Sequence, residues 1–212
     1  MRPTLFLLLI WQATASAQRD GLPSFTLKAN AGTLISPGKQ AIALTTDVRL
    51  APNVSLDLGT GYFFHSASFT QYKGESYQGL RLRSGIKFFP DAAENAPIHL
   101  GIEAKHNNIR HLKYREVLRQ GGQYQETLLT ERTVRSWGVA GRFGGYFYEG
   151  ARRRLLFEPY VGLGVVFHRV SIDLPPDAEL LERGGLLSFE YPVGRRRLLD
   201  LLLGLHIGYA FW

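Results

Sequence analysis

Hydrophobic and polar residues alternate with a period of two over the last segment of the chain, Leu198–Trp212. Every odd position from 199 to 211 carries a large apolar side chain, whereas the even positions include Asp200, His206 and several small residues. Successive side chains of a β-strand point to opposite faces. The segment therefore predicts a strand with one apolar face and one face of small or ionisable residues.

The same alternation recurs along the chain, so that eight strands are expected. The eight segments are residues 25–32, 42–50, 54–62, 80–88, 98–105, 136–147, 157–168 and 198–212. Each is close to the length that a tilted strand needs to cross a bilayer. A soluble sandwich buries the apolar face of such strands, whereas a membrane barrel turns it toward lipid. The aromatic content of 12% and the 23 glycines favour the barrel. No stretch after residue 17 has the ~18 unbroken apolar residues of a membrane-spanning helix.

The links between these segments alternate in length. Three are short turns, at Ala51–Asn53, Pro90–Pro97 and Gly150–Arg154. The others are one tight polar link and three long ones, at Ser36–Gln40, Ser66–Tyr77, Leu112–Glu131 and Ser171–Arg197. Short turns on one side and longer loops on the other are typical of outer-membrane barrels. The expected fold class is therefore all-β, an eight-stranded antiparallel up-and-down transmembrane β-barrel with its long links extracellular.

One segment bears on the strand count. Residues Leu186–Tyr191, inside the last long link, are interpreted as a short hairpin arm above the membrane. Counting them as a full strand makes the total odd and places the C-terminus on the wrong side of the membrane. Because bacterial barrels have even strand numbers, eight strands are preferred over the alternative of ten.

The first 17 residues have the features of a secretory signal peptide. A positive charge precedes the short apolar run Leu5–Trp11, and Ala15-Ser16-Ala17 offers the small residues that signal peptidase requires. The apolar run is too short to cross ~30 Å of hydrocarbon as a helix. We therefore expect cleavage before Gln18 and a barrel domain over residues 18–212. The chain has no cysteine, so this exported protein is expected to fold without disulfides.

The C-terminal sequence Tyr209-Ala210-Phe211-Trp212 resembles the aromatic last strand that barrel-assembly machinery recognises. The chain as a whole resembles the small OmpA/OmpX-type outer-membrane barrels. More narrowly, it resembles a Bacteroidota family of outer-membrane barrels of unknown function. That resemblance rests on the order of four short motifs, Leu27–Asn30, Ala51–Asp57, Gly79–Arg83 and Gly162–Gly164. It implies the barrel fold and the bacterial outer membrane as its location, and it implies no established activity.

Charged residues recur on the polar face of the expected strands, and in a barrel this face lines the interior. The cations are Lys28, Arg49, Arg81, Arg83, Lys87, Lys105 and Arg142, and the carboxylates are Asp47, Asp57, Glu103, Glu158 and Asp200. One interpretation is a permeation path or a ligand pocket. The interior of an eight-stranded barrel is just wide enough for side chains to fill it, which favours a plug of paired charges.

Five of these residues are predicted to form a charge network in the lumen. Arg83 and Arg142 fall near the middle of their strands, where an arginine facing lipid costs ~2–4 kcal/mol, so both are expected inside. In a narrow, dry interior they need counter-charges, which we expect from Asp57, Glu103 and Glu158. Which arginine meets which acid depends on the stagger of the strands, and the sequence leaves that open.

The sequence gives little support for a catalytic site or for a metal site. A lipid-modifying barrel enzyme needs a Ser-His-acid set on its outer surface. In the candidate His65-Ser66 the two side chains point to opposite faces with no acid beside them, so a strand-to-loop junction is preferred. The remaining histidines are scattered, at His99, His106, His111, His168 and His206. Without a cysteine or a His-x-His pair they favour hydrogen bonding over metal binding. We expect no enzyme activity, no catalytic residues, no cofactor and no metal.

The net charge of +7 bears on which partners the protein can bind. Export argues against nucleic acid, so anionic lipid headgroups or surface polysaccharide are the expected counter-charges. Arg152–Arg154, at a short turn, is placed to face phospholipid headgroups. Arg195–Arg197, above the last strand, is placed to meet lipopolysaccharide phosphates, which arginine binds well. Lys113–Arg119 is interpreted as a solvated loop, with polysaccharide or protein binding as the alternative.

The leading hypothesis for function is a non-enzymatic outer-membrane barrel that serves as envelope structure, adhesion surface or subunit of a complex. A narrow pore and, less favoured, a lipid-modifying enzyme are the alternatives. The expected partners are the bilayer of the outer membrane, lipopolysaccharide as a candidate ligand, barrel-assembly machinery during biogenesis and an unidentified protein in a complex.

Overall fold

The computed structural model describes residues 23–30, 41–64, 75–90, 97–149, 154–181 and 193–211. Eight main strands make up most of these residues. They are β1 (Phe25–Asn30), β2 (Ala41–Ala51), β3 (Val54–Phe63), β4 (Ser76–Phe88), β5 (Ile98–Arg119), β6 (Tyr124–Gly145), β8 (Leu155–Ile172) and β10 (Gly194–Phe211). The smaller elements are the three-residue strands β7 (Phe147–Glu149) and β9 (Ala178–Leu180) and the 3-10 turn η2 (Gln120–Gly122).

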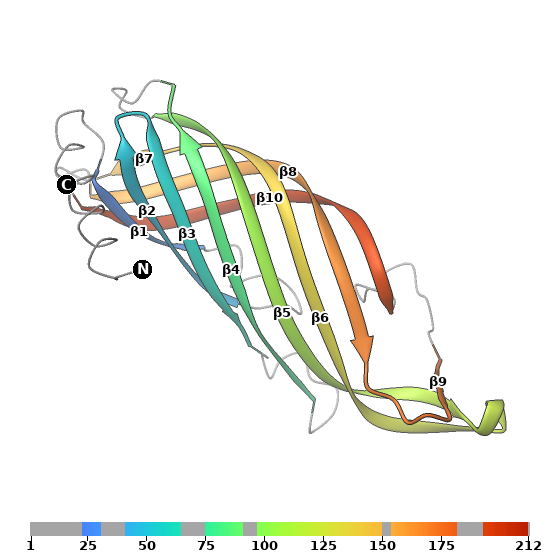
Figure 1. Cartoon of the computed structure of the whole chain (residues 1–212). Helices are drawn as coiled ribbons and strands as arrows, with labels where there is room; N and C mark the ends of the chain where they lie inside the picture. Colours follow the sequence, from blue (N-terminus) through green and yellow to red (C-terminus); the bar gives the residue numbers. More distant parts are fainter. Residues whose placement is uncertain are drawn as a thin grey trace, which may run out of the picture.

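The main strands pair in a closed antiparallel ring. Each pairs with its neighbours along the chain, and β10 pairs with both β8 and β1, so none of the eight lies at an edge. Figure 1 shows β1 to β6 side by side, with β8 and β10 passing behind β2, β3 and β4. The predictions of an all-β antiparallel fold and of eight consecutive main strands are confirmed. Closure removes the unpaired edges at which sheets aggregate.

The strands of the ring are staggered. From Asp47 on β2, the register partners lead one way through Thr26 to Ala210 on β10. The other way round, through β3, β4, β5, β6 and β8, they lead to Asp200, ten residues from Ala210 on the same strand. A ring with such a stagger has strongly tilted strands. Side chains at one level of the interior therefore come from different rows of the register.

The prediction that Leu112–Glu131 forms a long loop is wrong. β5 and β6 stay paired up to Arg119 and Tyr124, and only η2 and one further residue turn the chain between them. The glycines at 121 and 122 have φ of 66° and 93°, which glycine adopts without steric cost. The two glycines lie in this turn, and the charged residues on both sides of it belong to the strands. The predicted basic loop Lys113–Arg119 is consequently part of β5.

The link after β8 folds back onto this hairpin. β9 pairs with β5, placing Leu180 opposite Val117, and the Leu181 N–H donates to the Glu116 carbonyl at 3.1 Å. Figure 1 shows the hairpin of β5 and β6 extending past the other strands, with β9 beside its end. The predicted long link at Ser171–Arg197 thus contains a short paired strand.

Several predictions fall outside the described residues and stay predictions. They are the signal peptide at residues 1–17, the link Ser36–Gln40, the pair His65-Ser66, most of the links Ser66–Tyr77 and Pro90–Pro97, the turn Gly150–Arg154 except Arg154, and the hairpin arm Leu186–Tyr191.

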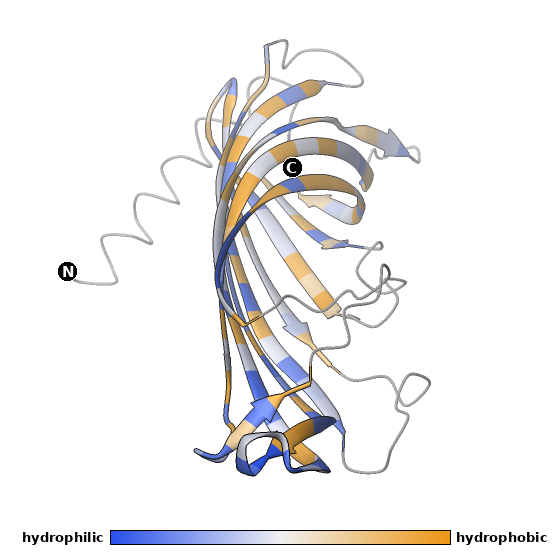
Figure 2. Cartoon of the chain, turned by 90° about the vertical axis from the view of Figure 1, so that its right-hand side faces the viewer, coloured by the Kyte–Doolittle hydropathy of each residue, from blue (hydrophilic) through white to orange (hydrophobic). Residues whose placement is uncertain are grey.

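Alternation along the strands gives the ring two different faces. On the outside, Leu199, Leu201 and Leu203 of β10 are exposed by 74%, 73% and 84%. Charged side chains point inward and are buried, among them Lys28 and Glu158. Figure 2 shows the same contrast as hydrophobic and hydrophilic residues alternating along the ribbons. The arrangement reverses that of water-soluble proteins, in which charged residues are almost never fully buried unless they are paired. Among the described residues, no helix is long and apolar enough to span a membrane.

Candidate functional site: a buried charge cluster

Eight charged side chains meet inside the ring, toward the end at which Ala51 and Val54 are joined by a short turn. We refer to them as the interior charge cluster. Its members are Lys28, Asp47, Asp57, Arg83, Lys87, Glu103, Arg142 and Glu158. They come from seven strands, and each of these strands contributes one or two charged residues to the cluster. Four cations are thereby matched by four carboxylates, as a dry interior requires.

Glu158 on β8 is the most highly connected member. Its carboxylate accepts from Lys28 Nζ at 2.5 Å and Lys87 Nζ at 2.7 Å, and Arg142 Nη2 lies 3.5 Å away. Two imidazoles complete its surroundings, with His206 Nδ1 at 2.8 Å and His99 Nε2 at 3.0 Å. The side chain is fully buried, so these contacts replace all of its hydration.

Asp47 on β2 is the second point at which the lysines converge. Lys28 Nζ lies 2.6 Å and Lys87 Nζ 3.1 Å from its Oδ2. The hydroxyl groups of Tyr146 and Thr26 donate to the same oxygen, the latter at 3.3 Å. Both ammonium groups also lie over the Tyr146 ring, 5.4 Å and 5.2 Å from its centroid, in the range of a cation–π interaction. Each lysine therefore bridges Asp47 and Glu158 across the interior.

Arg83 and Arg142, the two arginines chosen from the sequence, lie inside the ring beside the three chosen carboxylates. Arg142 Nη1 lies 2.9 Å from Glu103 and 3.4 Å from Asp57, and its Nη2 reaches Glu158. Arg83 lies 3.3 Å from Asp57 and 3.7 Å from Glu103, and it also donates to the Thr45 hydroxyl at 2.8 Å. Asp57 and Glu103 are therefore shared by both arginines, whereas Glu158 contacts only Arg142 among these two arginines.

The network predicted from the sequence lacks three of the eight cluster members and the tyrosine that supports them. Lys28, Asp47 and Lys87 are on the predicted inward face but are not part of the predicted network. The alternation along a strand shows which side chains point inward, but it does not show how deep in the ring they lie. Tyr146 lies just beyond the end of β6, within the predicted strand 136–147. The residues of that strand with even numbers point inward, and Tyr146 shares this alternation. This was the only signal in the sequence that could have identified it. The contact of His206 with Glu158 joins β10 to β8.

A separate pair lies in the same interior. Lys105 on β5 donates to Asp200 on β10, and their side chains are 15% and 17% exposed. Arg81 donates to Asn107 at 3.0 Å, and Asn107 donates to the Ser136 hydroxyl at 3.0 Å. The Lys105–Asp200 pair is less dry than the cluster, since Arg83, the most exposed member of the cluster, is exposed by 11%.

Side chains fill the space around the arginines. The hollow lined by Asp57, Lys87, Glu103 and Arg142 measures about 10 Å³. A water molecule needs at least ~10–15 Å³ of such space. The Arg142 guanidinium also stacks over the Tyr160 ring, 4.1 Å from its centroid. At this level the arrangement binds charges to one another and leaves no space for a hydrated ion beside them.

The candidate metal ligands do not gather. Within the described ranges, no group of three or more His, Asp, Glu or Cys side chains is placed to hold a metal ion. His99 and His206 contact Glu158, whereas the His111 ring packs edge-on against Tyr77 with centroids 5.6 Å apart.

No protein-family model matches the chain, and no curated protein matches it. Among solved structures, the chain is similar to the crystal structure of CarO from Acinetobacter baumannii. The similarity covers 90% of this chain and 98% of CarO, at 10% sequence identity and a TM-score of 0.37. A TM-score of this size supports no conclusion about function.

Proposed function

We propose that this chain is a non-enzymatic β-barrel of the bacterial outer membrane whose interior is closed by paired charges. The supporting observation is the polarity of the ring, with large apolar side chains outside and charged side chains buried inside. In water, an exposed apolar surface of this extent is unfavourable, whereas in a bilayer it is the required outer surface. A closed ring also satisfies the backbone hydrogen bonds that lipid leaves without partners.

Aromatic residues support a bilayer position. Phe25, Tyr209 and Phe211 gather where β1 meets β10, with ring centroids 5.5 Å apart for Phe25 and Phe211. Arg154 donates to the Tyr209 hydroxyl at 2.8 Å, which places a cation beside this aromatic group. Trp137 and Phe167 stack farther along the strands. Two aromatic girdles flanking an apolar band are typical of transmembrane barrels.

The outer-membrane location rests on the predicted signal peptide, the aromatic C-terminal sequence and the resemblance to OmpA/OmpX-type barrels. Cell fractionation and heat-modifiability on a gel test it. We expect the protein in the outer-membrane fraction, with a band that shifts on boiling. A soluble periplasmic protein whose band does not shift would overturn the proposal.

The orientation in the membrane follows from the positions of the links. The hairpin of β5 and β6 belongs to the long-link end and is proposed to be extracellular, with residues 150–154 periplasmic. Cysteines introduced as Q120C and R152C can be labelled on whole cells with an impermeant reagent. We expect labelling at 120 and protection at 152, and the opposite result would mean that the barrel is inverted.

We propose that such a barrel acts through the contacts that its exposed surfaces make. It would serve as envelope structure, as an adhesion surface or as a subunit of a complex. The hairpin of β5 and β6 offers an exposed surface to a protein partner, and co-purification from native membranes identifies that partner. Barrel-assembly machinery is the proposed partner during biogenesis.

A narrow pore is the second candidate, since the lumen is polar. The filled space around Arg142 favours a closed interior instead. Conductance in planar bilayers separates the two, because a closed barrel gives no ion current. A lipid-modifying enzyme is the third candidate, and mass spectrometry of lipid A from a deletion strain tests it.

A further inference from the structure

Three arginines lie directly opposite one another on the outer face of β6, β8 and β10. Arg135 is the register partner of Arg169, and Arg169 is the register partner of Arg195. All three are exposed. The Cα atoms of such cross-strand pairs lie about 4.5–5.5 Å apart. Like charges placed directly opposite each other destabilise a sheet, so an anion bound to this row would be stabilising.

The next row of the register adds an aromatic floor and a fourth arginine. Trp137 is the partner of Phe167, and their rings stack with centroids 4.2 Å apart and planes inclined by 15°. Arg197, the partner of Phe167, lies over that ring, 5.1 Å from its centroid. The two rows border a hollow of about 500 Å³.

The protein provides no counter-charge for these arginines among its described residues. No ion pair there joins Arg135, Arg169, Arg195 or Arg197 to a carboxylate. Other surface arginines differ. Arg119 lies 2.9 Å from Asp177, and Arg110 lies 3.8 Å from Glu131.

The surface on the other side of the aromatic row is apolar. Its next register row consists of Val139, Val165 and Leu199, which are exposed by 49%, 37% and 74%. The arginine row therefore stands four residues away from this apolar row along each strand, with the aromatic row between them, at the position where a lipid headgroup meets its acyl chains.

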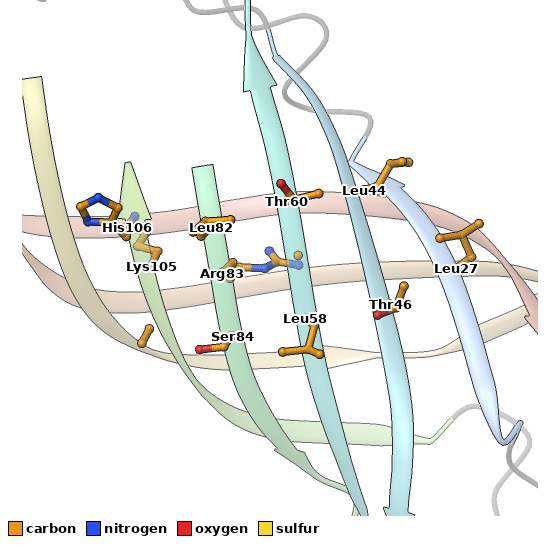
Figure 3. Close-up of a pocket in the computed structure, with 12 residues that line it drawn as sticks. Leu27, Leu44, Thr46, Leu58, Thr60, Leu82, Arg83, Ser84, Lys105 and His106 are labelled. Atoms are coloured by element: carbon orange, nitrogen blue, oxygen red, sulfur yellow. The ribbon is translucent and has the colours of Figure 1, made fainter. Parts of the chain in front are cut away.

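A second hollow lies beside the first along the outer face. It measures about 660 Å³, and Figure 3 shows its leucines on neighbouring strands, with Leu44, Leu58 and Leu82 on β2, β3 and β4. Small side chains, among them Thr60 and Ser84, alternate with these leucines. His106 borders both hollows, because it is the register partner of Leu82 on one side and of Trp137 on the other. An apolar hollow next to a cationic one fits an acyl chain next to its phosphate.

We propose that Arg135, Arg169, Arg195 and Arg197 form a binding site for the phosphate groups of a lipid, which in the outer leaflet of an outer membrane is lipopolysaccharide. Guanidinium groups form bidentate, charge-assisted hydrogen bonds with phosphate oxygens. The acyl chains of the same lipid lie along Val139, Val165 and Leu199. The site rests on the proposed function, because it needs the arginine row at a lipid interface.

The test is a comparison of two lipids on the full-length protein in an uncharged detergent. Lipid A and chemically dephosphorylated lipid A are titrated separately, and bound lipid is counted by native mass spectrometry. We expect lipid A to bind about tenfold more tightly or better, the scale of losing a bidentate arginine–phosphate contact. Equal binding of the two lipids would overturn the site.

Two triple variants localise the effect. R135Q/R169Q/R195Q is expected to lose the preference for phosphorylated lipid. R110Q/R119Q/R154Q removes the same charge from arginines that contact Glu131, Asp177 and Tyr209, and it is expected to keep the preference. An equal loss in both variants would mean that net charge alone attracts the lipid. If the first variant does not fold, the single substitution R169Q and the two-lipid comparison on the wild type decide.

Two further arms separate the possible outcomes. An excess of inorganic phosphate is expected to leave lipid A bound, and complete displacement would assign the site to free phosphate. Insertion into vesicles and the gel shift on boiling are recorded in parallel. A protein that inserts but does not distinguish the lipids contradicts this site alone, whereas a protein that never inserts contradicts the proposed function.

Discussion

The interior charge cluster and the hairpin of β5 and β6 use the same chemistry in two different surroundings. In the cluster, Glu158 is fully buried and contacts Lys28, Lys87 and Arg142. On the hairpin, Arg119 lies 3.6 Å from Glu126 and 2.9 Å from Asp177, and these two carboxylates are 41% and 44% exposed. Both regions carry paired charges on antiparallel strands, but only the first excludes water.

The difference determines what each pair contributes to stability. An exposed pair is weak, at ~0–1 kcal/mol, because water competes for both charges. Removing one partner of a buried pair costs ~3–5 kcal/mol, because the other charge is left buried without compensation. Between the two regions stands the Lys105–Asp200 pair, with intermediate exposure. A substitution is therefore expected to destabilise the protein more strongly the less water surrounds the charges that it affects.

Glu158→Gln is expected to have the largest effect. It leaves two lysines and one arginine with one carboxylate fewer, and we expect a loss of ~3–5 kcal/mol in the free energy of unfolding. Unfolding by urea in lipid vesicles measures it, with Glu126→Gln on the hairpin as the matched control. Because neighbouring side chains still fill the bore, no conductance should appear in planar bilayers. Unchanged stability together with a new ion current would show that the interior is a water-filled channel and is not closed by paired charges.

Tyr146→Phe is expected to come second. It removes the hydroxyl that donates to Asp47 and keeps the ring over which both lysines lie. A hydrogen bond to a charged group contributes ~1.5–3 kcal/mol, which is the loss we expect. The same unfolding assay measures it, and Tyr124→Phe at the exposed hairpin end is the control. Equal, small effects at both tyrosines would show that the Tyr146 hydroxyl does not stabilise the cluster.

Lys105→Met is expected to cost roughly 1–2 kcal/mol, between the values for exposed and buried pairs. Adding Asp200→Leu should restore most of the loss, because replacing both partners of an ion pair by apolar groups is often neutral. A double-mutant cycle gives the coupling between the two residues. Purely additive effects would show that the pair does not interact in the folded protein.

Arg119→Gln is expected to change the unfolding free energy least, by ~1 kcal/mol or less, since its partners are solvated. Raising the salt concentration should reduce even this difference, because salt screens exposed charges more than buried ones. A loss as large as that of Glu158→Gln would mean that the hairpin is as dry as the cluster.

The sequence alone determined the two faces and the strand count. Alternation along β10 separates Leu199, Leu201 and Leu203 from Asp200 whatever the strand pairs with, because a strand sends neighbouring side chains to opposite sides. The same local rule identified the inward charges on the other main strands. Local patterns also identified the short turn at Pro52 and Asn53.

The hairpin shows where local patterns mislead. Charged residues and the pair Gly121-Gly122 are typical of loops, yet backbone pairing carries β5 to Arg119 and β6 back from Tyr124. Backbone hydrogen bonds form independently of side-chain polarity, so a strand with polar residues on both faces has little hydrophobic alternation by which it could be recognised.

Only the tertiary structure decided which charges meet. Glu158 and Lys28 are 130 positions apart in sequence, and they come together because the ring closes with the ten-residue offset between Asp200 and Ala210. The register of β6 with β8 and of β8 with β10 likewise aligned Arg135, Arg169 and Arg195, which belong to three separate segments. The face of the sheet to which a side chain points is a property of one strand, and it can be read from the order of the residues in that strand. Register and stagger are properties of all eight strands together, fixed by the closure of the ring.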